Sequence, residues 1–186
     1  NFVITNQFKF QNNELKKPDI VLFINGIPVV VGEAKTPIRP SISWLDGAHE
    51  IHDIYENSIP QLFVPNILSF ATEGKELFYG AVNNPLQYWS PWRLNDNDNL
   101  EKKLGLGEIK DELIDLLSPE RLLDILKNFS LFTTNKKKQR SKVICRFQQY
   151  EGANKIVERV IEGKEKKGLI WHFQGSGKSL LMVFAA

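Results

Sequence analysis

Two apolar runs separated by Asn25-Gly26 stand out near the start of the chain. Residues 20–24 and 27–31 are mostly β-branched or aromatic, which suits buried strands. The Asn-Gly pair favours a tight turn because both residues tolerate positive φ. The pattern therefore predicts a hairpin, preceded by a strand within residues 1–10, where apolar and polar side chains alternate.

Helical spacing of apolar residues follows further along the chain. Residues 43–56, 108–117 and 147–162 each carry apolar side chains three and four positions apart. Ser118-Pro119 supplies the cap and the first-turn proline of another helix. Two more strands are predicted at residues 67–71 and 76–80. This mixture of elements predicts an α/β fold in which helices flank a mixed sheet.

Three charged side chains interrupt the apolar hairpin: Asp19, Glu33 and Lys35. A carboxylate beside an apolar sheet is costly unless a cation pairs with it. A divalent metal is such a partner, and so is an ammonium group. A solvated ion pair between Lys35 and Glu33 at the end of a strand explains the same residues, so the charges alone leave a catalytic and a structural interpretation open.

The register of the hairpin decides whether Asp19 can join Glu33. A two-residue Asn25-Gly26 turn pairs residues whose numbers sum to 51, which places Asp19 on the face opposite to Glu33. An even sum, from a three-residue or bulged turn, brings the two carboxylates to one face, and so does a bend at Asp19. Both faces are apolar, so the pattern cannot choose. A clustered site requires either the even sum or the bend at Asp19, and we predict one of the two.

A second candidate site lies near the end of the chain. Gly175-Ser176-Gly177-Lys178-Ser179 follows a predicted short strand at Gly168–Trp171 and opens a predicted helix. Glycines in this context let backbone N–H groups approach phosphates, the lysine reaches the terminal phosphates and the serine ligates Mg²⁺. The pattern predicts a nucleotide-binding loop.

Composition sets broad limits on these interpretations. The 186 residues are 42% hydrophobic and 25% charged, with a net charge of +2, which is ordinary for a globular protein. No apolar run reaches the roughly 20 residues that a membrane helix needs. The single cysteine, Cys145, excludes a disulfide framework and fits a reducing cytoplasm. The small net charge neither favours nor excludes a nucleic-acid partner.

Pro18-Asp19 and Glu33-Ala34-Lys35, separated by fourteen residues, resemble the PD-(D/E)-x-K nuclease signature. The surrounding string PDIVLFINGIPVVVGEAKTP resembles the N-terminal nuclease domain of type I restriction endonuclease R subunits. The resemblance implies a restriction-endonuclease-like mixed sheet with flanking helices. It also implies that Asp19 and Glu33 hold Mg²⁺, and that Asp19, Glu33 and Lys35 are catalytic.

In that family a Gln-x-x-x-Tyr motif follows on the next helix. Tyr55 matches its tyrosine and is the candidate for support of the active site or of DNA contact. Ile51 stands where the glutamine is expected, so this chain departs from the pattern. A shifted helix would bring Glu50 or His52 into the position instead.

The end of the chain resembles the helicase domain of the same subunits. His172-Phe173-Gln174 leads into the loop, and Arg146 with Gln149 resembles the Q motif that reads adenine. The implied nucleotide-binding residues are Arg146, Gln149, Gly175, Ser176, Gly177, Lys178 and Ser179, and the implied nucleotide is ATP. We expect a nuclease domain with a helical extension at residues 1–135 and the start of a RecA-like ATPase domain, incomplete in this sequence, at 136–186.

The resemblance implies a nuclease that cuts double-stranded DNA, coupled to ATP-driven translocation, in a complex with modification and specificity subunits. Two alternatives remain at this point. One is an inactive DNA-binding module attached to a helicase, which the missing glutamine favours and the complete set of Asp19, Glu33 and Lys35 disfavours. The other is a helicase-nuclease of DNA repair.

Overall fold

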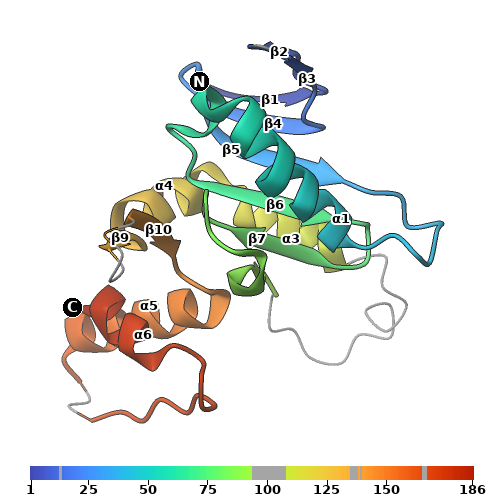
Figure 1. The fold of residues 1–186 in the computed structure, drawn as a ribbon. Helices are drawn as coiled ribbons and strands as arrows, with labels where there is room; N and C mark the ends of the chain where they lie inside the picture. Colours follow the sequence, from blue (N-terminus) through green and yellow to red (C-terminus); the bar gives the residue numbers. More distant parts are fainter. Residues whose placement is uncertain (13, 94–107, 135–137, 139, 165–166) are drawn as a thin grey trace.

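A six-stranded mixed sheet forms the centre of the protein in a computed structural model, which describes all residues except 13, 94–107, 135–137, 139 and 165–166 (Figure 1). The strand order is β1-β4-β5-β6-β7-β8. β5 and β6 run parallel, and the other neighbours are antiparallel. The strands are β1 (Phe2–Asn6), β4 (Ile20–Ile24), β5 (Ile27–Ala34), β6 (Leu68–Thr72), β7 (Leu77–Gly80) and β8 (Ser90–Pro91). The predicted mixed sheet with flanking helices is confirmed.

A helical segment of three parts covers one face of this sheet (Figure 1). It consists of α1 (Trp44–His49), a π-helical stretch η1 (Glu50–Tyr55) and α2 (Glu56–Ser58). Ser43 caps its start, and Asp46 completes a capping box with it. Ala48, Ile51 and Tyr55 pack from this helix onto strands β4 to β6. The predicted helix at 43–56 is therefore present, but its second half is not an α-helix.

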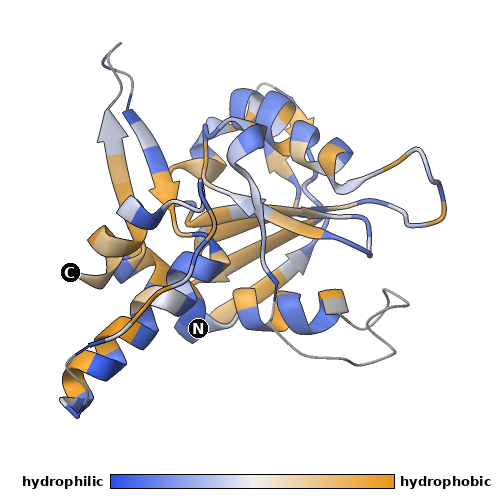
Figure 2. Cartoon of the chain, turned by 90° about the horizontal axis from the view of Figure 1, so that it is seen from below, coloured by the Kyte–Doolittle hydropathy of each residue, from blue (hydrophilic) through white to orange (hydrophobic). Residues whose placement is uncertain are grey.

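The opposite face of the sheet packs against α3 (Glu108–Leu116) and α4 (Pro119–Asn128). Ser118 caps α4 as predicted, since its side chain accepts a hydrogen bond from the backbone of Arg121. Apolar residues concentrate along the central strands, whereas the outer helix faces are more polar (Figure 2). The sheet is therefore buried on both sides, which explains why both faces of the hairpin are apolar.

The last part of the chain begins with a hairpin of β9 (Ser130–Thr134) and β10 (Arg140–Ile144). It continues with α5 (Phe147–Glu162), which begins and ends as predicted, and α6 (Lys178–Ala185). Between them, the strand predicted at Gly168–Trp171 is wrong, because this segment forms no strand. Leu169 and Trp171 are 86% and 89% exposed, and no strand among the described residues lies beside them to supply the pairing hydrogen bonds.

One apolar core joins the sheet to the C-terminal helices. Trp92 packs edge-on against Tyr79 of the sheet and Phe147 of α5, and the Tyr79 hydroxyl donates a hydrogen bond to the Cys145 carbonyl. The division at residue 135 stays a prediction, because side chains from both sides of it share this core.

The shorter elements are β2 (Phe10–Gln11), β3 (Leu15–Lys16), η2 (Pro60–Phe63) and η3 (Leu86–Tyr88). Residues 95–99, a run of Asn and Asp for which the sequence predicts a polar loop, lie outside the described residues. No helix in the described part of the chain is long and apolar enough to cross a membrane.

Candidate active site and nucleotide loop

A β-bulge sets the register of the central hairpin. Asn25 and Gly26 have φ of 51° and 81° and form the tight turn, so Ile24 pairs with Ile27 at the odd sum of 51. The register shifts between Phe23 and Leu22. Phe23 pairs with Pro28, but Leu22 pairs with Val30, so Val29 is an extra residue on β5. The even sum is therefore confirmed, but it comes from a bulge inside β5 rather than from a three-residue turn.

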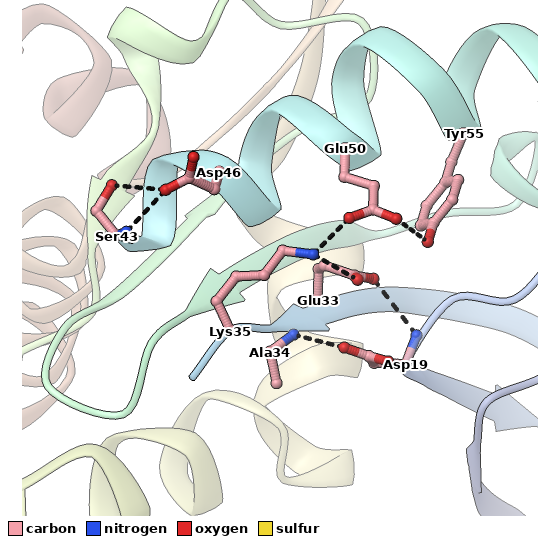
Figure 3. Close-up of polar contacts among 8 residues, drawn as sticks. All are labelled: Asp19, Glu33, Ala34, Lys35, Ser43, Asp46, Glu50 and Tyr55. Carbon is pink, nitrogen blue, oxygen red and sulfur yellow. Dashed lines mark hydrogen bonds and ion pairs between the residues drawn. The ribbon is translucent and has the colours of Figure 1, made fainter. Parts of the chain in front are cut away.

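The shifted register places Asp19 beside Glu33. Ile20 pairs with Gly32, so the next position on each strand brings the two acidic residues opposite each other. The Asp19 backbone N–H donates to Glu33 Oε2 at 3.4 Å, and the Ala34 N–H donates to Asp19 Oδ2 at 3.1 Å. Figure 3 shows the two side chains at the neighbouring ends of β4 and β5. A shallow cavity of about 520 Å³ opens beside Asp19.

Glu33 and Lys35 form an ion pair at the same strand end. Lys35 Nζ lies 3.1 Å from Glu33 Oε1. Glu33 is only 3% exposed, and this burial raises the pKa of its carboxyl to about 7, against the opposing effect of Lys35. A buried carboxyl with a pKa near neutrality is typical of a site that takes up a cation or a proton.

Glu50 is a functional candidate that the motif spacing did not select. It comes from the π-helical stretch η1, and its side chain points towards Lys35 (Figure 3). Glu50 Oε2 forms a short ion pair with Lys35 Nζ, and Glu50 Oε1 accepts a hydrogen bond of 2.7 Å from the Tyr55 hydroxyl. Ile51, at the position expected for glutamine, is fully buried in the core. The structure thus selects Glu50 of the two residues that a shifted helix could offer.

The donor set at Asp19 and Glu33 fits Mg²⁺. Carboxylate oxygens are the ligands that this ion prefers, and proteins often supply only one or two of them, with water and phosphate completing the shell. Within the described residues, no group of three or more acidic, histidine or cysteine side chains is arranged to hold a metal. Two carboxylates at the neighbouring ends of β4 and β5, one of them the buried Glu33 with a raised pKa, therefore suit a magnesium ion that shares its shell with a substrate.

The glycine-rich loop near the C-terminus is held from α5. Gly175 and Gly177 have φ of 85° and 81°, and α6 begins at Lys178. Gln149 is buried, and its amide donates to the carbonyl oxygens of Ser176 and Gly177 at 3.3 and 3.0 Å. The side-chain oxygen of Gln149 accepts a hydrogen bond of 2.8 Å from the backbone N–H of Arg146. Gln149 of the predicted Q motif is thus in contact with the loop, and Arg146 is joined to the loop through Gln149.

The side chain of Lys178 binds backbone carbonyl groups, and Ser179 is exposed to solvent. Lys178 Nζ donates to the carbonyls of His172 and Phe173, each at 3.1 Å. Ser179 is exposed in the first turn of α6, and the buried Ser176 hydroxyl has no hydrogen-bond partner among the described residues. A cavity of about 540 Å³ borders Gly175 and Gly177. This is space enough for a nucleotide beside the loop.

The fold and the two sites define an α/β protein that combines a carboxylate–lysine site on a bulged hairpin with a glycine-rich loop at the start of a helix. Two family models match the chain: "Type I restriction enzyme R protein N terminus" over residues 1–88, and "SWI2/SNF2 ATPase" over residues 148–186. The chain belongs to the type I restriction enzyme R protein family.

Individual relatives agree with the family models. The chain is 34% identical to the type I restriction enzyme HindI endonuclease subunit of Haemophilus influenzae, and the match covers 100% of the chain and 18% of that protein. It is 36% identical to the putative type I restriction enzyme MjaVIIP endonuclease subunit of Methanocaldococcus jannaschii, over 94% of the chain and 17% of that protein. The chain thus spans less than a fifth of the length of these curated relatives.

Proposed function

We propose that this chain forms the DNA-cleaving part of a type I restriction enzyme R subunit, with a restriction-endonuclease-like PD-(D/E)-x-K fold. The reaction is Mg²⁺-dependent hydrolysis of phosphodiester bonds in double-stranded DNA. The observation that carries this proposal is the bulged register, which sets Asp19 opposite Glu33 with the Lys35 ammonium in contact. A structural hairpin has no need for this arrangement, since it buries a carboxylate at a cost.

Each residue of the site has a role in this proposal. Asp19 and Glu33 hold Mg²⁺, and the Ala34 carbonyl, which lies between Glu33 and Lys35 in the chain, offers a further oxygen. When bound, the ion supplies a water of lowered pKa and neutralises charge on the phosphate. Lys35 donates hydrogen bonds to the attacking water or to the charged transition state. The open cavity borders Asp19 and Ala34, so a phosphate can approach the site from the side of Asp19.

The second half of the proposal concerns ATP. The loop from Gly175 to Ser179 binds the phosphates, with Lys178 released from its two carbonyl partners to reach them. Gln149 and Arg146 link this loop to the start of α5. The match of residues 148–186 to an ATPase model supports this assignment. In the whole R subunit, ATP hydrolysis drives translocation along DNA, and modification and specificity subunits complete the complex.

Plasmid cleavage by the full-length R subunit, assembled with its modification and specificity subunits, tests the nuclease assignment. We expect Asp19→Asn to reduce Mg²⁺-dependent cleavage at least about 100-fold, because loss of a metal ligand removes several kcal/mol of transition-state stabilisation. Asp53→Asn is the matched control, since Asp53 faces outward and contacts His49 and His52. Unchanged cleavage in Asp19→Asn would exclude this site.

A further inference from the structure

The helix that covers the active site changes its winding above Lys35. Between α1 and α2, residues Glu50–Tyr55 form a π-helix, in which hydrogen bonds connect residues five apart. The wider turn brings Glu50 and Tyr55 to one side of the helix, where their side chains are hydrogen bonded at 2.7 Å (Figure 3). Single π-turns are rare and frequently occur at functional sites. The π-turn therefore suggests a functional role for the residues that it positions, and the residue that it brings to Lys35 is Glu50.

Lys35 has two carboxylate partners that come from different elements. Glu33 belongs to the same strand, whereas Glu50 reaches the ammonium from the helix above it. In the proposed reaction Glu33 would also hold Mg²⁺, so its negative charge would be shared between the ion and Lys35. Glu50 is the second carboxylate that fixes the ammonium in the site.

Both oxygens of Glu50 are engaged by protein groups. Oε2 contacts the Lys35 ammonium, and Oε1 accepts the Tyr55 hydroxyl hydrogen bond. Because both of its oxygens have protein partners, Glu50 is poorly placed to serve as a third metal ligand. Its contact with the Lys35 ammonium indicates that it acts through Lys35. The ion pair is partly exposed, with side-chain exposures of 23% for Lys35 and 33% for Glu50. Exposed pairs add little to stability, so a purely structural role gives no reason for the π-turn.

We infer that Glu50 is a positioning residue, held by Tyr55 and the π-turn, which keeps the Lys35 ammonium aimed at the reacting phosphate. This inference rests on the proposed nuclease function. It adds a residue of the covering helix, Glu50, to that site. Glutamine in place of Glu50 preserves the arrangement, because its carbonyl can accept from Lys35 while its amide donates to the Tyr55 oxygen. Alanine removes both contacts.

Single-turnover plasmid cleavage by the full-length R subunit in its complex tests the inference. At saturating DNA and Mg²⁺, we expect Glu50→Ala to lower the cleavage rate about 10- to 100-fold, as loss of a residue that orients a catalytic group does. The Mg²⁺ concentration for half-maximal rate stays within about twofold of the wild type. Glu50→Gln restores most of the rate, Tyr55→Phe gives an intermediate loss, and Asp53→Ala, an outward-facing acid of the same helix, has no effect.

A second readout does not depend on catalysis. Labelling of Lys35 by an amine-reactive ester, followed by mass spectrometry of the uncleaved protein, should increase several-fold in Glu50→Ala and remain unchanged in Asp53→Ala. Wild-type cleavage rates in Glu50→Ala, or a large increase in the Mg²⁺ requirement in that variant, would overturn the inference. Equal losses in Glu50→Gln and Glu50→Ala would also overturn it. Full cleavage by Asp19→Asn would instead refute the nuclease function itself, so the two failures are distinguishable.

Discussion

Replacing Glu33 with glutamine should stabilise the protein while it abolishes metal-dependent cleavage. Glu33 is 3% exposed, and this burial raises the pKa of its carboxyl from 4.5 to about 7. Above pH 7 the folded protein holds a buried carboxylate whose ammonium partner, Lys35, is shared with Glu50. Glutamine keeps the shape of the side chain and removes that charge. Residues of an active site are often destabilising in this way.

The size and pH dependence of the effect follow from the pKa. One pKa unit corresponds to 1.36 kcal/mol, so a rise from 4.5 to about 7 corresponds to about 3 kcal/mol. The folded state binds this proton more tightly than the unfolded state. Wild-type stability therefore falls as the pH rises from about 4.5 to about 7 and is level above that range. This value already includes the favourable effect of Lys35. Because glutamine is neutral like the protonated carboxyl, we expect a net gain of up to about 3 kcal/mol at pH 8 and almost none at pH 4.5.

Urea unfolding of the 186-residue chain at pH 4.5 and pH 8, with and without Mg²⁺, measures this gain. Added Mg²⁺ should stabilise the wild type at pH 8, by about 2.7 kcal/mol at 100 times the dissociation constant, and leave the variant unchanged. Glu14→Gln is the control, because Glu14 forms an exposed pair with Lys16. A Glu33→Gln variant that is less stable than the wild type at pH 8 would refute the reasoning, as would an equal gain at both pH values.

Three further predictions concern other parts of the chain. Gly32→Ala should lower the free energy of unfolding by about 1–3 kcal/mol or more in urea titrations, because its Cβ would lie 2.2 Å from the ring of Phe70; an unchanged midpoint would contradict this packing. Lys142→Met should raise the free energy of unfolding at pH 7 by about 1–3 kcal/mol, since burial lowers the pKa of Lys142 to about 8. The difference between variant and wild type should disappear as the pH rises from 8 towards 10.5, because the wild type becomes more stable over that range. A variant that is less stable than the wild type at pH 7 would contradict this prediction. Lys178→Ala should weaken ATP binding by the full-length R subunit at least about tenfold in calorimetry, and equal affinity would exclude the loop as the phosphate site.

Local signals in the sequence were sufficient for most helices. Ser118 followed by Pro119 correctly marked the start of α4, and the apolar spacing of residues 147–162 gave α5 with its observed ends. In both cases the forces that fix the element act between neighbours in the chain, through capping and through one buried face. Such features can be recognised without knowledge of the rest of the fold.

The hairpin register could be predicted only as a condition for a clustered site. Val29 is apolar and β-branched, like its neighbours, and nothing in its identity marks it as the bulged residue. Its position results from packing on both faces of β5, against the helix on one side and α3 and α4 on the other. Because both faces are buried, the usual alternation of apolar and polar residues is absent and cannot specify the register.

Glu50 and the missing strand show two further limits. The family motif places its glutamine four residues before the tyrosine, which suits an α-helix. In the π-turn of this chain, the hydrogen-bond partner of Tyr55 is the residue five positions earlier, Glu50. The apolar residues at Gly168–Trp171 suit a strand, but a strand forms only when a neighbour supplies hydrogen bonds, and the described residues offer none there. In each case the outcome depends on contacts that are distant in the sequence.

The position of a bound metal ion tests the central claim most directly. Crystals of the protein soaked in Mn²⁺, which substitutes for Mg²⁺ at oxygen-rich sites, can be measured at a wavelength where manganese scatters anomalously. We predict an anomalous peak between the carboxylates of Asp19 and Glu33, at about 2.0–2.3 Å from an oxygen of each, which disappears in Asp19→Asn. A well-ordered hairpin without such a peak, or a peak at other residues only, would contradict the account.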